Sequence, residues 1–383
     1  MIKKPSKIVI VGAGPVGCYL GQLLKQHGFD PLILEEHPEV GKPVQCAGIV
    51  GRGLFEDMRI PLSHRSILNI IDGSLVSYRE RSFELHRPKV AYIVDRELFD
   101  KELSHKLNIE YNARLNDIKR IKDGYILETT NGEYFTEIVV GADGPNSRVR
   151  KGLAFHSEMR LYRGYQYRAK MEMAKLNQVV TDYNVPFSLF NWVIPEGENG
   201  LVRIGSISNN PYQDLNSFIE RQGYKFELVE KNAGAIPIGT CQLVKEWAAL
   251  VGDAACQIKP ITSGGIYYGL KSAELLADAI KAGNLSQYEV RWGEEFGQEV
   301  KTCLLIRNVL ENMDEKVLAK VFDYVRENAK VIEKMGDFEN HSSVVWGLIS
   351  NPRTYSTVGT VMMGMLKNPK FLMQSLLKYP RGK

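Results

Sequence analysis

Cysteine is scarce and scattered in this chain of 383 residues. The five cysteines form no CxxC pair, so the sequence predicts neither a zinc site nor a disulfide framework. No apolar run reaches the ~18 residues of a membrane-spanning helix. The first residues also lack the apolar core of a signal peptide. We therefore expect a reducing, cytoplasmic setting.

A large excess of one charge is also missing. The formal net charge is only +4, and no basic helix is interleaved with aromatic residues, so we expect no nucleic-acid partner. Hydrophobic residues make up 44% of the chain and charged residues 25%, which supplies a large core. A chain of this length predicts two or three compact units.

The N-terminal segment carries a dinucleotide-binding pattern. A strand at 7–11 leads into a glycine loop, a helix then runs to Gly28, and a second strand at 31–34 ends at an acid. Such glycines let a pyrophosphate approach the backbone, and the helix N-terminus favours the negative charge of that pyrophosphate. The acid accepts a hydrogen bond from a ribose hydroxyl. The residues that we predict to bind are Gly12, Gly14, Pro15, Gly17 and Glu35.

The rest of the chain predicts a mixed α/β protein. Its periodicity indicates an extended loop at 39–53, short strands within 60–94, a helix at 96–107 and a β-meander at 118–140, with hairpin turns at Asp123-Gly124 and Asn131-Gly132. Residues 162–238 are strand-rich and predict an antiparallel sheet. A strand follows Trp247, a helix spans 266–282, and everything beyond Ser286 is expected to be helical.

Two later segments suit further cofactor contacts. Residues 141–147, with Asp143 among them, follow a strand and fit an ordinary turn equally well. In the second segment Asp253 ends a strand, and Pro260, Gly264 and Gly265 precede a helix. Asp253 is placed to hold a ribityl hydroxyl of a cofactor. The helix N-terminus is placed to stabilise negative charge on the ring of that cofactor. Ordinary helix capping is the alternative for this segment.

Together these segments resemble the FAD-binding pattern of the p-hydroxybenzoate hydroxylase-type flavoproteins. Asp95-Arg96 and Phe99-Asp100 also match the DRxxFD segment of that group. The resemblance implies FAD as the cofactor, with Arg96 near the pyrophosphate. Taken by itself, Arg96 fits a surface charge on a helix.

The fold class that this resemblance implies is α/β, with a discontinuous Rossmann-type FAD-binding domain. We assign residues 1–60, 91–160 and 240–285 to that domain. Residues 61–90 and 161–239 are expected to form an antiparallel β substrate domain, and residues 286–383 a C-terminal helical region.

Within this group the chain is most similar to the geranylgeranyl reductases. Residues 37–46 resemble their xPExGxPxxC loop, residues 190–195 their YxWxFP motif with Gly205 following, and residues 252–266 their GDAAxxxxPxxGGGI segment. Departures from these motifs are Phe190, Ile194, Glu196 and Ser263. The 190–195 motif is also similar to the WxWxIP motif of flavin-dependent halogenases.

The resemblance implies reduction of C=C bonds in an isoprenoid lipid, with Cys46 at the flavin ring in a catalytic role. An apolar tunnel for the chain would be lined by Tyr165, Tyr167, Phe190, Trp192 and Pro195, for which core packing is the alternative. The electron donor stays open between NADPH and ferredoxin. A monooxygenase or halogenase is the alternative enzyme, and a non-catalytic lipid-binding or electron-carrying flavoprotein is the third hypothesis.

The C-terminal tail is basic and apolar. No acidic residue follows Glu339, whereas lysines and arginines alternate with methionine, leucine and phenylalanine from Arg353 to Lys383. Such a helix suits peripheral contact with a membrane surface. It equally suits packing on the protein body with its basic face in water.

Removing residues from Thr357 onward should weaken binding to anionic vesicles more than binding of FAD. Each basic residue near an anionic surface contributes roughly 1 kcal/mol, and salt screens that attraction. Vesicle co-sedimentation at low and high salt measures the difference. Identical co-sedimentation with and without the tail at low salt would leave only the packing role.

Overall fold

The computed structural model describes residues 2–184 and 189–349, which divide into two compact units. The first unit comprises residues 2–67, 94–162 and 235–297, and the second comprises the other described residues. Among the described residues no helix is long and apolar enough to cross a membrane.

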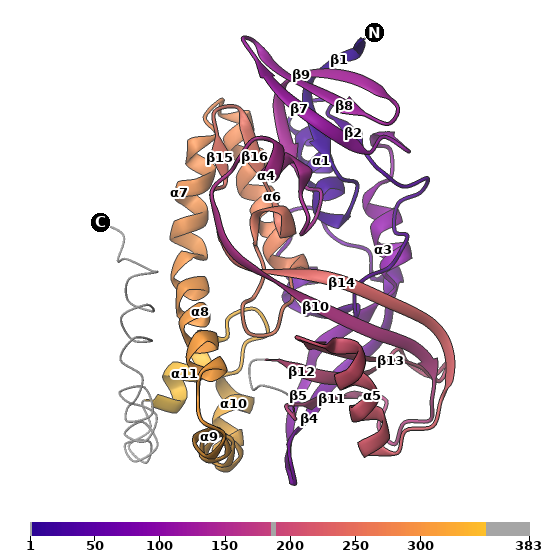
Figure 1. The fold of residues 1–383 in the computed structure, drawn as a ribbon, viewed down its shortest axis with the longest axis vertical. Helices are drawn as coiled ribbons and strands as arrows, with labels where there is room; N and C mark the ends of the chain where they lie inside the picture. Colours follow the sequence, from indigo (N-terminus) through magenta and orange to yellow (C-terminus); the bar gives the residue numbers. More distant parts are fainter. Residues whose placement is uncertain (1, 185–188, 350–383) are drawn as a thin grey trace. The chain divides into compact units, whose positions relative to one another are not determined.

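A mostly parallel sheet lies at the centre of the first unit (Figure 1). Its order is β15-β16-β9-β1-β2-β6, and all neighbours from β16 to β6 run parallel. Val9, Ile10 and Val11 of β1 are all buried, as expected for a strand covered on both faces. The bounds are β1 Ile2–Val11, β2 Leu32–Leu34, β6 Asn108–Glu110, β7 Leu115–Ile121, β8 Gly124–Thr129, β9 Gly132–Gly141, β15 Val244–Lys245 and β16 Ala248–Leu250.

The helices of this unit confirm the predicted βαβ opening. Helix α1 is terminated at Gly28, as expected. Gly28 has φ +85°, and the Phe29 N–H donates back to the Leu24 carbonyl. The predicted helix at 96–107 is too long, because α3 ends at Leu103. The loop predicted at 39–53 contains the short strand β3. The bounds are β3 Ile49–Gly51, α1 Pro15–Gln26, α2 Gly53–Glu56, η1 His64–Ser66, α3 Arg96–Leu103, α4 Arg148–Gly152, η2 Gly252–Ala255, α6 Ile266–Lys281 and α7 Ser286–Glu295.

The predicted meander is confirmed as β7-β8-β9, with its turns one residue earlier than expected. Ile121 pairs with Gly124 and Thr129 with Gly132, so each two-residue loop lies before its glycine. Gly124 and Gly132 have φ of +154° and +123°. Glycine is therefore required at the first residue of the returning strand.

The antiparallel sheet predicted for the second unit is confirmed, with one parallel pair that the sequence did not predict. Its strands follow the order β14-β10-β13-β12-β11-β4-β5, and β4 runs parallel to β11. The strands within 60–94 are not short: β4 and β5 have 12 and 14 residues, because the alternation of half-buried and exposed side chains continues through the charged stretch of β5. The bounds are β4 Ile67–Tyr78, β5 Arg81–Val94, β10 Ser157–Lys170, β11 Gln178–Asp182, β12 Phe190–Pro195, β13 Leu201–Ser208 and β14 Glu227–Cys241.

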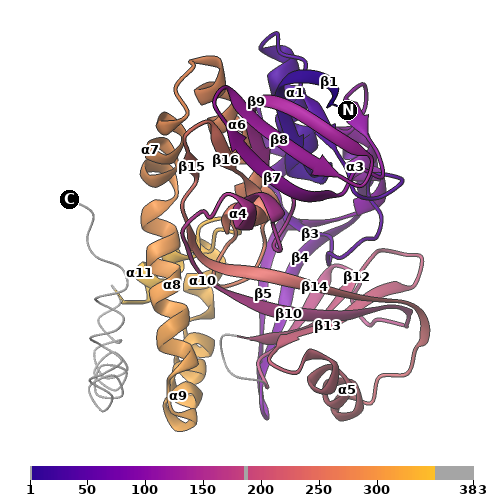
Figure 2. The same cartoon turned by 45° about the horizontal axis from the view of Figure 1, so that its top comes forward.

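Helix α5, Pro211–Gln222, was missed inside the strand-rich region. The helix lies beside the strands of this sheet (Figure 2). Its Leu215 and Phe218 belong to one buried cluster with Tyr167, Val193 and Ile204 of the sheet. Its local signals are Pro211 at the first turn and Gly223 in the left-handed region after the last turn. Beyond Ser286 the predicted helical character is confirmed as far as residue 349, and the tail from residue 350 lies outside the described residues. The remaining helices are α8 Gly297–Glu311, α9 Glu315–Glu327, α10 Ala329–Met335 and α11 Ser342–Ile349.

Gly205 and Trp192 form a cross-strand pair between β13 and β12. A Cβ on Gly205 would lie 2.1 Å from Cζ2 of the Trp192 indole. The indole therefore lies directly over the glycine, and no larger residue fits beneath it.

We predict that Gly205→Ala lowers the free energy of unfolding by about 1–3 kcal/mol, the usual range for overpacking. Gly293→Ala in α7 is the matched control, because a Cβ at this position would have no neighbouring atom within 4 Å. That control should be neutral or stabilising by about 0.5–1 kcal/mol. Urea unfolding measures both, and equal effects at the two positions would contradict the packing account.

Candidate functional site

The glycine loop between β1 and α1 is shaped by close backbone contacts. A Cβ on Gly12, which has φ +104°, would lie 2.4 Å from the Ala142 carbonyl oxygen. A Cβ on Gly17 would lie 2.1 Å from the Gly12 carbonyl oxygen. In contrast, nothing lies within 4 Å of a Cβ on Gly14. Two glycines are thus needed for packing, and the third faces open space.

Gly14 is the N-cap of α1, and Pro15 follows as the first helical residue. No side chain caps this end, and the first turn holds no acidic residue. The positive end of the helix dipole is therefore not neutralised by the first turn of α1. Together with the open space at Gly14, this makes a site suited to an anion such as a pyrophosphate.

Glu35 follows β2 and holds the glycine loop in place. Its buried carboxylate accepts the Ala13 N–H through Oε2 at 2.8 Å. Oε1 accepts the backbone N–H of His37 at 2.9 Å and lies 2.7 Å from its Nδ1. Because each carboxylate oxygen accepts more than one hydrogen bond, Oε2 retains acceptor capacity for the ribose hydroxyl expected from the sequence.

The segment 141–147 packs directly on the glycine loop and also caps a helix. Asp143 Oδ2 accepts the N–H groups of Arg148 and Val149, at 2.7 and 3.2 Å, at the start of α4. Its other oxygen, Oδ1, is buried and has no hydrogen-bond partner among the described residues. Burial raises the pKa of this carboxyl, against the opposing hydrogen bonds from Ser147 and the helix N–H groups. The segment therefore does cap a helix, and one oxygen of Asp143 is still left for a ligand.

Asp253 lies in η2, directly after β16. Burial raises the pKa of its carboxyl to about 6, against the opposing charge of Arg96. Its side chain makes no hydrogen bond within the described part of the chain that would offset this desolvation. A Cβ on Gly265 would lie 2.7 Å from Asp253 Oδ1. The carboxylate thus lies at the N-terminus of α6, where a ligand hydroxyl would supply the missing hydrogen bond.

The loop from Pro260 to Gly265 leads into α6. Gly265 is the N-cap, with no side-chain cap and no acidic residue in the first turn, so this helix end also favours negative charge. A Cβ on Gly264 would lie 2.8 Å from Cε of Lys259. Ser263 has φ +64°, a conformation that favours glycine, and this is the position where the reductase motif has glycine.

Arg96 is buried rather than a surface charge. Its side chain is 13% exposed, and Nε and Nη2 donate to the two oxygens of Asp100 at 3.0 and 2.8 Å. The guanidinium also hydrogen-bonds the Cys46 thiol and acts electrostatically on Asp253. The Cys46 sulfur accepts the Gly48 N–H at 3.3 Å. Arg96 therefore interacts with residues of two other sequence motifs, through a hydrogen bond to Cys46 and through its charge on Asp253.

Sequence reasoning missed Arg150, which joins the second and third motifs. This residue of α4 is 3% exposed. Its Nη1 donates to the Ala254 carbonyl and its Nη2 to the Pro145 carbonyl, each at 2.6 Å. No local pattern distinguishes it from its basic neighbours Arg148 and Lys151. Only the fold shows that its side chain points inward.

The five predicted tunnel residues of the second unit do not share one face of the sheet. Residues opposite one another in antiparallel strands lie on the same face. Tyr167 and Val193 are both opposite Ile204, so the odd-numbered residues of β10 and β12 lie on the α5 face. That face carries Tyr165, Tyr167 and Pro195, where core packing is the simpler interpretation.

Phe190 and Trp192 occupy the other face. Their ring centroids are 5.9 Å apart, and Tyr183 lies 5.9 Å from Phe190. The Trp192 Nε1 is a buried donor with no acceptor among the described residues. These two residues remain candidates for contact with an apolar chain.

Comparison with known proteins identifies the fold class of this chain. A model of NAD(P)-binding Rossmann-like domains matches residues 10–47. A geranylgeranyl bacteriochlorophyll reductase-like protein from Thermoplasma acidophilum superposes with a TM-score of 0.80 at 19% identity, covering 94% of this chain and 99% of its own. A p-nitrophenol 4-monooxygenase from Pseudomonas putida superposes with a TM-score of 0.67 at 18% identity, covering 87% of this chain and 97% of its own. The chain therefore has the predicted flavoprotein fold, with its Rossmann-like unit, second sheet and C-terminal helices.

The sequence relatives are more specific. Proteins named digeranylgeranylglycerophospholipid reductase from Methanosarcina acetivorans and Methanothermobacter thermautotrophicus are 25% and 28% identical, covering 84% and 82% of this chain and 88% and 89% of their own. An uncharacterized protein of Methanocaldococcus jannaschii is 29% identical over 88% of this chain and 93% of its own. The resemblance to the geranylgeranyl reductases is thereby confirmed.

The residues of the first unit fit FAD, the cofactor that this fold family implies. Gly14 leaves open space at an uncapped helix end, and Asp143 keeps a buried oxygen without a partner in the described chain. Asp253 lies at the second uncapped helix end. Two helix ends and two carboxylates are the groups that a dinucleotide with a ribityl chain requires.

Gly14→Val should lower the affinity for FAD by at least about 10-fold, since each lost hydrogen bond to a charged group is worth roughly 1.5–3 kcal/mol. The fold should persist, because Gly14 has φ −67° and ψ 176°, which valine adopts without strain. Flavin released per chain and urea unfolding of the apoprotein measure the two effects. Full FAD occupancy in this variant would show that the loop does not hold the pyrophosphate.

Proposed function

We propose that this protein is an FAD-dependent oxidoreductase that reduces isolated C=C bonds of a prenyl lipid chain. The observation that carries the proposal is the position of Cys46. Its loop matches the reductase motif, and its thiol contacts Arg96, which also acts on Asp253. The reductase names of relatives that match more than four fifths of the chain support the same reaction.

Bound FAD in its reduced form supplies a hydride. The chain itself would bind the pyrophosphate at Gly14, a ribose hydroxyl at Glu35 and a ribityl hydroxyl at Asp253. An isolated alkene is not polarised, so a proton must reach the second carbon from a nearby group, and water must be excluded. We propose that Cys46 either donates this proton or positions the alkene to receive it.

Phe190 and Trp192 are proposed to contact the prenyl chain. They form one aromatic face with Tyr183, and burial raises the pKa of the Tyr183 hydroxyl to about 12. That hydroxyl stays neutral at physiological pH, although the charge of the buried Arg307 acts on it, so Tyr183 itself adds no charge to the face. Peripheral membrane contact by the basic tail is proposed on sequence grounds alone, and NADPH or ferredoxin remains the proposed electron donor.

Anaerobic mixing tests this function against its alternatives. The flavin of the holoenzyme is reduced chemically, then mixed with a geranylgeranyl lipid or with its saturated analogue. Reoxidation by the unsaturated lipid only, with gain of one hydrogen molecule per reduced bond by mass spectrometry, is the expected result. Incorporation of labelled oxygen into the product in air would instead support a monooxygenase. If no lipid reoxidised the flavin, the result would support a non-catalytic carrier.

Cys46→Ser and Cys46→Ala should bind FAD and be reduced normally, yet reoxidise with the alkene about 10²–10⁴-fold more slowly, the usual effect of losing one proton-transfer group. Cys241→Ser is the matched control, because its half-buried thiol donates to the Gln242 carbonyl and lies outside the proposed machinery. Partly saturated products would indicate positioning, whereas uniform slowing would indicate proton transfer. Unchanged single-turnover rates would remove Cys46 from the reaction.

A further inference from the structure

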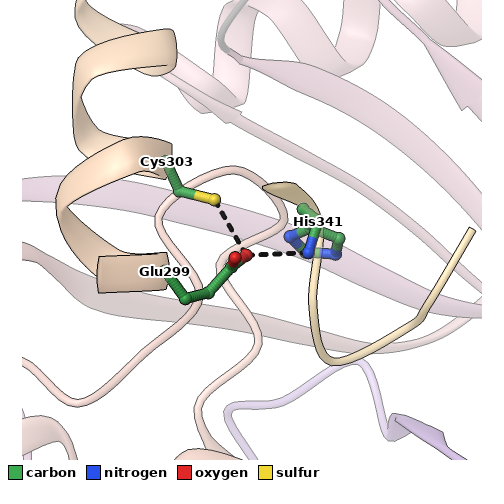
Figure 3. Close-up of side chains that lie close together, drawn as sticks. All are labelled: Glu299, Cys303 and His341. Carbon is green, nitrogen blue, oxygen red and sulfur yellow. Dashed lines mark hydrogen bonds between the residues drawn. The ribbon is translucent and has the colours of Figure 1, made fainter. Parts of the chain in front are cut away.

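Three metal-ligating side chains meet in the second unit, and none of them is assigned to the proposed function. Glu299 and Cys303 are one turn apart on α8, and His341 immediately precedes α11. One ligand atom from each of the three lies within 4.8 Å of the others. Figure 3 shows the two side chains of α8 pointing toward the histidine. The 37 residues between Cys303 and His341 explain why no sequence motif revealed this set.

The three groups are the ligand types that zinc binds. Thiolate, imidazole and carboxylate coordinate Zn²⁺ at about 2.3, 2.0–2.1 and 2.0–2.2 Å. In a tetrahedral site these bond lengths place the ligand atoms roughly 3.3–3.7 Å apart. The Cys303 sulfur is already 3.0 Å from Glu299 Oε1. Small side-chain rotations of Cys303 and His341 would therefore complete the geometry.

Backbone hydrogen bonds already orient the carboxylate. Glu299 Oε1 accepts the N–H of His341 at 2.7 Å and that of Ser342 at 3.1 Å. Oε2 lies 3.3 Å from the same Ser342 nitrogen. The carboxylate thus fixes the backbone that carries the histidine, as an outer hydrogen-bond shell does in metal sites. Cys303 is fully buried, which restricts its thiol to the same small space.

We propose that Glu299, Cys303 and His341 form a binding site for one Zn²⁺ ion. The bound ion replaces the thiol proton, which passes to solvent, while the carboxylate keeps its backbone donors. Three protein ligands leave the fourth position to water or another small ligand. The ion would join α8 to the segment that enters α11. This zinc site does not depend on the proposed function.

The test is metal content and X-ray absorption of the FAD-loaded protein after equilibration with Zn²⁺ and dialysis. We expect one zinc per chain, with one sulfur neighbour at about 2.3 Å and nitrogen or oxygen neighbours at about 2.0–2.2 Å. Cys303→Ser and His341→Ala should each lower zinc affinity at least about 10-fold. His156→Ala is the control, because that side chain is 79% exposed, and it should leave affinity unchanged.

Each other outcome overturns the proposal. Two sulfur neighbours would place the ion at the interacting Cys241 and Cys256 thiols. Zinc retained equally by Cys303→Ser would exclude Cys303 as a ligand and with it the proposed three-residue site. No zinc after dialysis would leave Glu299 as a hydrogen-bond acceptor for α11 only. Far-ultraviolet circular dichroism and flavin content show that each variant is folded, so that lost zinc cannot be ascribed to unfolding.

Discussion

The proposed cofactor site depends on the contact between the glycine loop and the end of β9. A Cβ on Gly12 would lie 2.4 Å from the Ala142 carbonyl oxygen, so the backbones of the first two motifs touch. Parallel pairing of β9 with β1 and of β16 with β9 brings the three strand ends to the same edge of the sheet. The residues that follow those strands are therefore neighbours in space, although more than 200 residues separate the first from the last. This is the edge at which parallel α/β sheets bind ligands.

Buried charge stabilises this arrangement. Arg150 bridges two of the motifs by donating to their backbone carbonyls, and Arg96 lies between Asp100 and Cys46. A buried guanidinium is tolerated only when its donors are paired. Asp253 is the contrasting case, because its pKa is raised to about 6 by burial, with only the Arg96 charge opposing the shift. The free energy lost in burying that carboxylate is what a ligand hydroxyl would recover.

Local signals were sufficient for much of the fold. The run from Lys7 to Glu35 predicted a strand, helix and strand, because buried parallel strands are continuously apolar and Gly28 can adopt a positive φ. The helix at 266–282 and the hairpins of the meander were likewise predictable. Helix α5 was missed because aromatic strands surround it, although Pro211 and Gly223 mark its ends.

Which side chains come together could not be predicted from the sequence alone. Tyr165 and Trp192 were both expected to line one tunnel, yet the register of β10, β13 and β12 places them on opposite faces. In a strand, a shift of one residue moves a side chain to the other face. Arg150 and the Glu299, Cys303 and His341 set gave no signal for a different reason. Their chemistry depends on tertiary contacts that no periodicity encodes.

Amide hydrogen exchange of the apoprotein and the FAD-loaded protein tests most directly whether the motifs form one cofactor site. The account predicts that FAD slows amide exchange in three segments at once, which are residues 12–17, 143–149 and 253–268. The exchange rate of α9 in the second unit should be unchanged. Protection of the first segment without the third would contradict it, because a nucleotide held by the glycine loop alone would leave Asp253 and the α6 N-terminus without a ligand.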